Sequence, residues 1–219
     1  MDNFIVLYNP LAGNGTAQDK MRELESLMQG DSLYFSNMLD IRDYGAFFND
    51  MPDGASIIIC GGDGTLNRFL NDTEDIRPDC DIYYYPSGSG NDFARDIGAE
   101  RNKPPVLISR YIERLPEICV NGTVHRFING IGYGIDGYCC EKGDELRGKG
   151  DGEVNYTAIA IKGLLFHYKP TGATITVDGV EHRFEKVWLA PTMIGRYYGG
   201  GMMPTPAQDR LGEDGAVSV

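Results

Sequence analysis

The chain has 219 residues with 20 basic and 32 acidic side chains, so its formal net charge is −12. A domain with this charge lacks the basic surface expected of a nucleic-acid-binding protein, and anionic lipids would repel it at long range. Glycine supplies 29 of the 219 residues, near twice its usual share of roughly 7%. These glycines gather in short polar loops, which indicates that the backbone comes close to a ligand there.

The first hundred residues alternate between predicted strands and predicted helices. Short apolar or β-branched runs predict strands at 4–8, 33–35, 56–60 and 82–85. Capping residues and helical spacing predict helices at 16–28, 44–49, 66–71 and 92–97. This alternation is typical of a parallel sheet covered by helices. Three strands end in glycine-rich loops, after Tyr8, Cys60 and Tyr85, and ligands bind at that edge of such sheets.

The pattern changes after Lys103-Pro104-Pro105. Short strand-like runs follow at 117–120, 124–128, 173–177 and 186–190, with one long helix predicted at 154–168. Asn121-Gly122 and Asp178-Gly179 lie between such runs and predict tight hairpin turns. We therefore expect an α/β domain with a parallel sheet at 1–122 and a mostly antiparallel β domain at 123–219.

The segment Gly61-Gly62-Asp63-Gly64-Thr65-Leu66-Asn67 joins a predicted strand to a predicted helix. Its glycines let the backbone approach a ligand, and the N–H groups at the helix start favour a phosphate. A carboxylate beside a phosphate is repulsive unless a cation bridges them, so Asp63 predicts Mg²⁺, held directly or through water. The Thr65 hydroxyl could add a contact to the phosphate. The alternative is a tight turn that only reverses the chain.

Two standard nucleotide motifs do not fit elsewhere in the chain. The stretch from Gly13 to Gln18 has glutamine where the dinucleotide fingerprint requires its third glycine. The stretch from Gly143 to Gly150 nearly matches a P-loop, but it ends in glycine instead of serine or threonine and no predicted strand precedes it. We interpret this second stretch as a surface loop.

The Gly-Gly-Asp-Gly-Thr motif at 61–65 resembles the nucleotide loop of diacylglycerol-kinase-type lipid kinases, with sphingosine, ceramide and NAD kinases as more distant relatives. Asn9-Pro10 with Gly13 is similar to the opening phosphate loop of that family. The segment 86–94, Pro-Ser-Gly-Ser-Gly-Asn-Asp-Phe-Ala, resembles the lipid-kinase form of a third motif that NAD kinases do not carry. Segments 129–136 and 199–202 also resemble parts of the family.

This resemblance implies an α/β nucleotide-binding domain and a sandwich-like β domain, with the active site in the cleft between them. It assigns ATP binding to residues in three loops: Asn9, Pro10, Gly13, Asn14, Gly61, Gly62, Gly64, Thr65, Asn67, Ser89, Gly90 and Asn91. It also implies that Mg²⁺ joins Asp63 to the phosphates and that Asp92 contacts the lipid headgroup. Asp92 could also serve as a helix N-cap. Asp209 and Asp214 resemble a family metal site, and the alternative is two solvated acids.

The reaction implied is transfer of the γ-phosphoryl group of ATP to the hydroxyl of a diacylglycerol-like lipid. The family's general base is a glutamate in a late Asp-Gly-Glu-type segment. The stretch Asp151-Gly152-Glu153 has this sequence but precedes a predicted helix, so we do not favour Glu153 as the base. We expect the base beyond Val219. One alternative is therefore a nucleotide-binding module that is catalytically incomplete in this chain. An NAD-kinase-like enzyme is the third hypothesis.

The expected partner is a lipid at a membrane surface, reached by transient contact from the cytoplasm at the inner membrane face. Five cysteines without CxxC spacing and an N-terminus without a signal-peptide pattern favour the cytoplasm. Lys142, Arg147 and Lys149 form a local basic cluster that could touch a membrane. The apolar stretch 158–166 could line a path for an acyl chain or pack as a buried helix. No nucleic-acid partner is expected, and a homodimer is left open.

Overall fold

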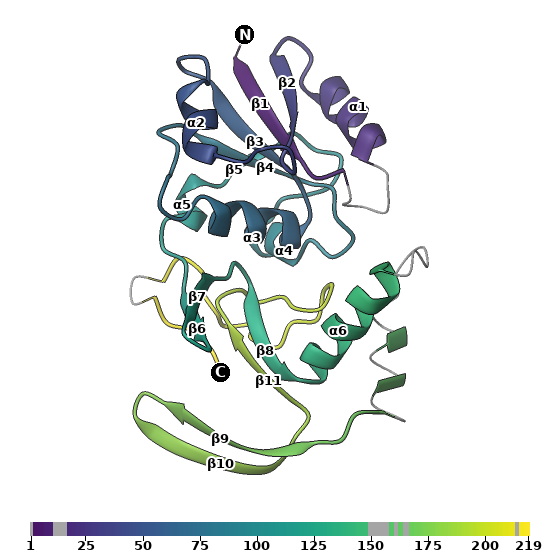
Figure 1. Cartoon of the computed structure of the whole chain (residues 1–219), viewed down its shortest axis with the longest axis vertical. Coiled ribbons are helices and arrows are strands. Elements are labelled where there is room, and N and C mark those ends of the chain that lie inside the picture. Colours follow the sequence, from purple (N-terminus) through teal and green to yellow (C-terminus); the bar gives the residue numbers. More distant parts are fainter. Residues whose placement is uncertain (1, 11–16, 149–157, 160–161, 164–166, 213–214) are drawn as a thin grey trace. The chain divides into compact units, whose positions relative to one another are not determined.

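A computed structural model of the chain describes residues 2–10, 17–148, 158–159, 162–163, 167–212 and 215–219. The chain divides into two compact units (Figure 1). Unit 1 contains Met1–Asn129 and Ile194–Ala216, and unit 2 contains Gly130–Met193 and Val217–Val219. Unit 1 is therefore built from two separate stretches of the chain.

The sheet of unit 1 has the strand order β2-β1-β3-β4-β5. Its strands are β1 (Asn3–Tyr8), β2 (Ser32–Asn37), β3 (Ser56–Gly61), β4 (Ile82–Pro86) and β5 (Val106–Leu107). The first four are parallel, and β5 pairs antiparallel with β4. Tyr8 pairs with Asn37 and with Cys60, and Gly61 pairs with Pro86, so the parallel strands end at one common edge.

The described residues of unit 1 form five helices: α1 (Ala17–Leu27), α2 (Tyr44–Asn49), α3 (Asp63–Asp72), α4 (Asp92–Ile97) and α5 (Ser109–Ile112). Ile57 and Ile59 belong to one core cluster, which also holds buried residues of α2 to α5. Ile58 and Cys60 belong to a second cluster with Leu24 of α1. Successive residues of β3 therefore face opposite helical layers, which explains why the strand is apolar throughout.

A short hairpin ends the first stretch of unit 1. Strands β6 (Glu117–Val120) and β7 (Thr123–Arg126) pair antiparallel. Between them Asn121 and Gly122 have φ values of 52° and 85°, which confirms the predicted tight turn. Unit 1 extends to Asn129, whereas the sequence-based division fell between residues 122 and 123. The difference arises because α3 side chains hold the backbone of residues 126–128, a long-range contact described below.

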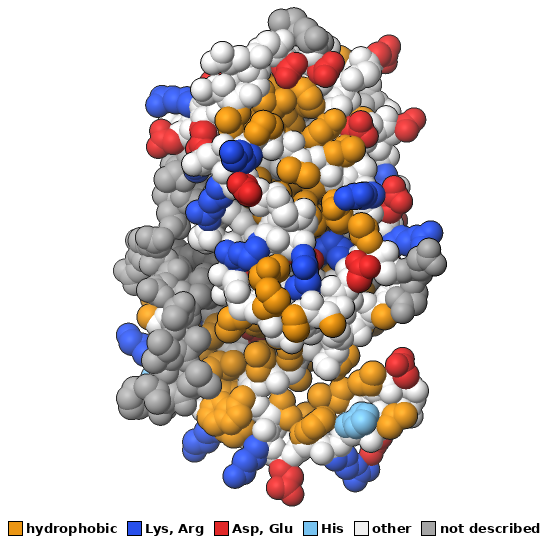
Figure 2. Space-filling model, turned by 180° about the vertical axis from the view of Figure 1, so that it is seen from behind, with side chains coloured by type: hydrophobic (Ala, Val, Ile, Leu, Met, Phe, Trp, Pro, Cys, Tyr) orange, Lys and Arg blue, Asp and Glu red, His pale blue; other side chains and the backbone are white. Residues whose placement is uncertain are grey.

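Unit 2 consists of paired antiparallel strands and a helix. Strand β8 (Gly130–Gly134) pairs with β11 (Leu189–Met193), and β9 (Thr171–Val177) pairs with β10 (Val180–Val187). The β9–β10 turn at Asp178-Gly179 has φ values of 50° and 81°, again as predicted. Val180 and Phe184 of this hairpin are exposed. Figure 2 shows hydrophobic side chains at the surface in this part of unit 2.

Helix α6 (Ile135–Gly148) corrects one sequence interpretation, because the stretch from Gly143 to Gly148 is helical and is not a surface loop. Its glycines lower helix propensity, which hid the helix, but Lys142 and Glu145 form an ion pair of 2.8 Å along its surface. The helix predicted at 154–168 falls largely on residues that the structure does not describe. The predicted strand 186–190 covers the end of β10 and the start of β11.

The fold class predicted from the sequence is confirmed. A parallel sheet with helices on both faces comes first, and antiparallel strand pairs follow. None of the helices in the described part of the chain combines the length and the apolar character that crossing a bilayer requires.

Candidate functional site

The candidate site lies in unit 1, at the edge where the parallel strands end. Three of the loops that leave this edge carry the predicted motifs: the one after β1, the one between β3 and α3, and the one between β4 and α4. Asn9 and Pro10 begin the first loop and are half-buried. Gly13 and Asn14, also predicted there, lie outside the described residues.

The second and third loops touch through their glycines. The Ser87 N–H donates to the Gly61 carbonyl over 2.9 Å. A Cβ atom on Gly62 would lie 3.0 Å from the Gly88 Cα, and one on Gly88 would collide with the Gly62 backbone. Gly61 is equally confined, because a Cβ there would collide with the side chain of Thr65. Part of the glycine requirement thus comes from the protein's own loops.

Helix α3 starts directly behind Gly62, three residues earlier than the sequence predicted. Gly62 is its N-cap, and Asp63 and Gly64 lie in its first turn. The motif is therefore the start of a helix, and not a turn that only reverses the chain. A Cβ on Gly64 would have no atom within 4 Å, so the backbone is open to solvent there.

The Asp63 carboxylate is fixed by three N–H donors. Its Oδ2 accepts from the Asp92 N–H over 3.0 Å. Its Oδ1 accepts from the Phe93 N–H over 2.8 Å and from Nδ2 of Asn129 over 3.0 Å. The N-cap residue of α4 is Asn91, which has φ of 53°, and its own side chain does not accept from the first N–H groups of the helix. Asp63 thus caps α4 from another element, a role that sequence reasoning did not predict because its partners lie 29 to 66 residues away.

Asp92 is 7% exposed and is the first residue of α4. Its Oδ1 accepts from Nη1 of Arg95 over 3.0 Å, and its Oδ2 accepts from the Gly200 N–H over 2.8 Å. Burial raises the pKa of Asp92 and the charge of Asp63 adds to this, while the hydrogen bond from Gly200 and the charge of Arg95 oppose it. The glycine segment 199–202 therefore contacts the third motif.

Ser89, Gly90 and Asn91 form the rest of the third loop. A Cβ on Gly90 would lie 3.4 Å from Oδ2 of Asp63, so that oxygen faces this loop. Asn91 is 6% exposed, and its Nδ2 donates to the Gly88 carbonyl over 2.8 Å. Its Oδ1 has no hydrogen-bond partner in the part of the chain that the structure describes. Arg101, which the sequence did not single out, donates to the carbonyls of Gly88 and Ser89.

The remaining predicted residues are placed as follows. Thr65 is 5% exposed and packs against Gly61. Asn67 uses its Oδ1 to accept from the Ile128 N–H over 3.1 Å. Asp209 is exposed, and its Oδ1 accepts from the Leu211 N–H over 3.0 Å. Asp214 lies outside the described residues, so the predicted pair of acids is not seen together.

Comparison with known proteins decides the family. The family model for the diacylglycerol kinase catalytic domain matches residues 3–118 of the sequence, which include all three loops. The chain belongs to this family. A diacylglycerol kinase of Mycobacterium tuberculosis is 25% identical over 172 residues, which cover 75% of this chain and 53% of that protein. The chain thus spans about half the length of this relative.

Two further comparisons cover nearly the whole chain. A Staphylococcus carnosus protein named as a lipid kinase is 24% identical over 226 residues, covering 98% of this chain and 72% of that protein. A solved structure from Bacillus anthracis, named as a diacylglycerol kinase, superposes with a TM-score of 0.63 at 20% identity, covering 99% of this chain and 74% of that one. This second likeness shows the shared fold.

For a diacylglycerol kinase catalytic domain, the carboxylates at this edge are suitable ligands for Mg²⁺. From the described residues, Oδ1 of Asp63 accepts two hydrogen bonds and Oδ2 accepts one, so Oδ2 has acceptor capacity left on the side of Gly90. Within the described residues, no three His, Cys, Asp or Glu side chains form a group that could hold a metal. One or two carboxylates fit Mg²⁺, which in such enzymes takes its other ligands from water and substrate phosphates.

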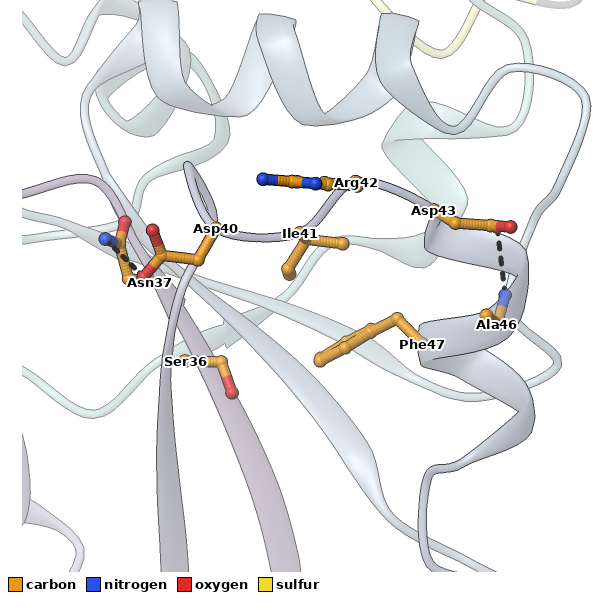
Figure 3. Close-up of a pocket in the computed structure, with 8 residues that line it drawn as sticks. All are labelled: Ser36, Asn37, Asp40, Ile41, Arg42, Asp43, Ala46 and Phe47. Atoms are coloured by element: carbon orange, nitrogen blue, oxygen red, sulfur yellow. Dashed lines mark hydrogen bonds between the residues drawn. The ribbon is translucent and has the colours of Figure 1, made fainter.

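A pocket of this kinase domain lies beside the same edge, where β2 ends (Figure 3). It has a volume of about 440 Å³, and its lining residues are Ser36, Asn37, Asp40, Ile41, Arg42, Asp43, Ala46 and Phe47. Asn37 donates to Asp40 over 2.9 Å, and Asp43 accepts from the Ala46 N–H over 3.0 Å to cap α2. No sequence motif predicts this pocket, because its lining combines unrelated polar and apolar residues.

Proposed function

We propose that this chain binds Mg²⁺ and ATP at the carboxyl edge of its parallel sheet and transfers the γ-phosphoryl group to the hydroxyl of a diacylglycerol-like lipid. The observation that carries the proposal is the Asp63 carboxylate, held by three donors at the start of α3 with Oδ2 toward the third loop. Membership of the diacylglycerol kinase family supports the same reaction class.

The phosphates would lie against the start of α3. The first N–H groups of a helix have no partner within the helix and attract anions, and α3 has 10 residues. Gly62 and Gly64 keep this backbone free of side chains. The half-buried Asn9 and Pro10 would approach the phosphates from the neighbouring strand.

The nucleoside would occupy the pocket at the end of β2. Two strand spacings, about 10 Å, separate β2 from β3, because β1 lies between them. The Asp40 carboxylate offers acceptors for ribose hydroxyls, while Ile41 and Phe47 offer apolar contact for a base (Figure 3). A nucleotide lying along the edge would thus reach from this pocket to α3.

When bound, Mg²⁺ would neutralise charge on the phosphates, as phosphoryl transfer requires. Asp63 would hold it through Oδ2, directly or through a water molecule. Asp92 would orient the lipid headgroup, since its Oδ1 accepts from Arg95, its Oδ2 accepts from Gly200, and a carboxylate oxygen can accept more than one hydrogen bond.

The lipid would be met at a membrane surface by a cytoplasmic protein. Of the basic cluster suggested by the sequence, Lys142 pairs with Glu145, while the Arg147 side chain and Lys149 lie outside what the structure describes. With a net charge of −12, membrane contact would depend on local apolar or basic groups and not on the overall charge.

A radiolabelled phosphoryl-transfer assay tests this proposal. The chain is incubated with [γ-³²P]ATP, Mg²⁺ and mixed micelles of diacylglycerol, and we expect label in a phosphorylated lipid. Because the chain spans 53% of its M. tuberculosis relative, the second candidate is a nucleotide-binding module that is catalytically incomplete in this chain. Bound ATP without lipid turnover would favour that candidate. Turnover with NAD in place of lipid would favour an NAD-kinase-like enzyme and contradict the proposal.

A further inference from the structure

A buried ionic cluster in unit 1 lies outside the three loops. Asp96 of α4 accepts from Nε of Arg196 over 2.7 Å and from Nε of Arg210 over 2.8 Å. The Asp96 and Arg210 side chains are each only 4% exposed, whereas Arg196 is 38% exposed. Removing two charges from water costs free energy, which offsets the attraction between them. A gain in fold stability therefore does not by itself explain why this buried pair is present.

Arg210 is confined on every side of its guanidinium. Besides Asp96, it donates through Nη1 to the Ile128 carbonyl and through Nη2 to Oδ1 of Asn129 over 2.9 Å. Its Cζ lies 4.7 Å from the centre of the Phe93 ring. A planar fork with fixed donors can satisfy all of these contacts at once, and the single ammonium of a lysine cannot.

Asn129 joins this cluster to the candidate site. Its Oδ1 accepts from Arg210, and its Nδ2 donates to Oδ1 of Asp63 over 3.0 Å. A guanidinium only donates and a carboxylate only accepts, so the amide of Asn129 has one favourable orientation between them. Without Arg210 the amide could turn its oxygen toward Asp63 and repel it.

We propose that Arg210 is a positioning residue, which acts through Asn129 to fix the Asp63 carboxylate so that Oδ2 faces the Mg²⁺ bound with ATP. This inference rests on the function proposed above. Partners of a metal-binding carboxylate commonly change metal affinity 10- to 100-fold when they are lost. The effect of losing Arg210 should therefore appear in the Mg²⁺-dependent part of ATP binding.

The test is calorimetric titration of ATP into the chain, once with Mg²⁺ and once with EDTA. For Arg210→Lys and Asn129→Ala we expect ATP affinity with Mg²⁺ to fall about tenfold or more, while affinity in EDTA stays within about twofold. Arg196→Gln is the matched control, because Arg196 contacts the same Asp96 but not Asn129. It should leave both affinities unchanged.

The outcomes separate the two proposals. If Asn129→Ala folds and keeps the wild-type affinity for ATP with Mg²⁺, the positioning role is wrong, whatever happens to Arg210→Lys. Equal losses with Mg²⁺ and with EDTA would show a purely structural role and would also overturn it. If the wild-type chain itself shows no Mg²⁺-dependent ATP binding, the proposed function fails and this inference falls with it.

Discussion

Gly61, Gly62 and Gly88 show why glycine is so frequent in this chain. The sequence predicts that glycine loops bring the backbone close to a ligand. In the structure these three glycines also let the protein contact itself, because added Cβ atoms would meet Thr65 or the opposite loop. A sequence pattern cannot separate these two needs, since both require the same missing side chain.

Gly88→Ala should destabilise the chain by about 1–3 kcal/mol, the usual cost of an added methyl group in a packed site. The new Cβ would collide with the Gly62 backbone, which has no flexible end to move away. Gly64→Ala is the control, because a Cβ there meets nothing and alanine favours the helix. Urea unfolding measures both, and a Gly88→Ala variant as stable as Gly64→Ala would contradict the close approach of the loops.

Asp92→Asn should change how stability depends on pH. Because the pKa of Asp92 is raised in the folded protein, its carboxyl group binds a proton more tightly there than in the unfolded chain. The Asp92 carboxyl therefore lowers stability as the pH rises above about 4, where it ionises in the unfolded chain. The variant cannot ionise, so its stability relative to wild type should increase with pH above about 4 and then level off. Urea unfolding from pH 4 to 8 tests this, and a constant difference would contradict the raised pKa.

At the scale of elements, one face of α3 organises the site. Asp63, Asn67 and Asn71 are spaced four residues apart, so they lie along one side of the helix. They bond to Asn129, to the Ile128 N–H and to the Arg126 backbone, respectively. The helix itself could be predicted from the sequence, apart from its first turn. The hydrogen bonds of Asp63, Asn67 and Asn71 could not be predicted, because their partners lie 55 to 66 residues away and show no periodicity.

Asn71→Ala should cost about 2 kcal/mol of stability, since it removes both hydrogen bonds to the backbone of Arg126 and leaves partly buried groups unpaired. Arg68→Ala on the exposed side of the same helix is the control. Its ion pair with Asp72 is solvent-exposed, so its loss should cost less than about 1 kcal/mol. Thermal or urea unfolding compares the two variants. Equal losses of unfolding free energy would contradict a stabilising role for the Asn71 hydrogen bonds.

For the whole molecule, local patterns predict the order of the elements but not the path of the chain between units. The strands, the hairpin turns at 121–122 and 178–179, and the loop motifs follow from nearby residues. The return of residues 194–216 to unit 1 depends on Gly200 with Asp92 and on Arg196 and Arg210 with Asp96. These are polar contacts across 100 to 114 residues, and no periodicity in the local sequence indicates which side chains meet.

Titration of ATP into the wild-type and Asp63→Ala proteins tests whether Asp63 holds the Mg²⁺ that binds with ATP. Circular dichroism first establishes that the variant is folded, because Asp63 also caps α4. We expect wild-type affinity for ATP to be higher with Mg²⁺ than with EDTA, and the variant to lose this difference. A folded Asp63→Ala protein that binds ATP with the wild-type dependence on Mg²⁺ would show that Asp63 does not hold the metal.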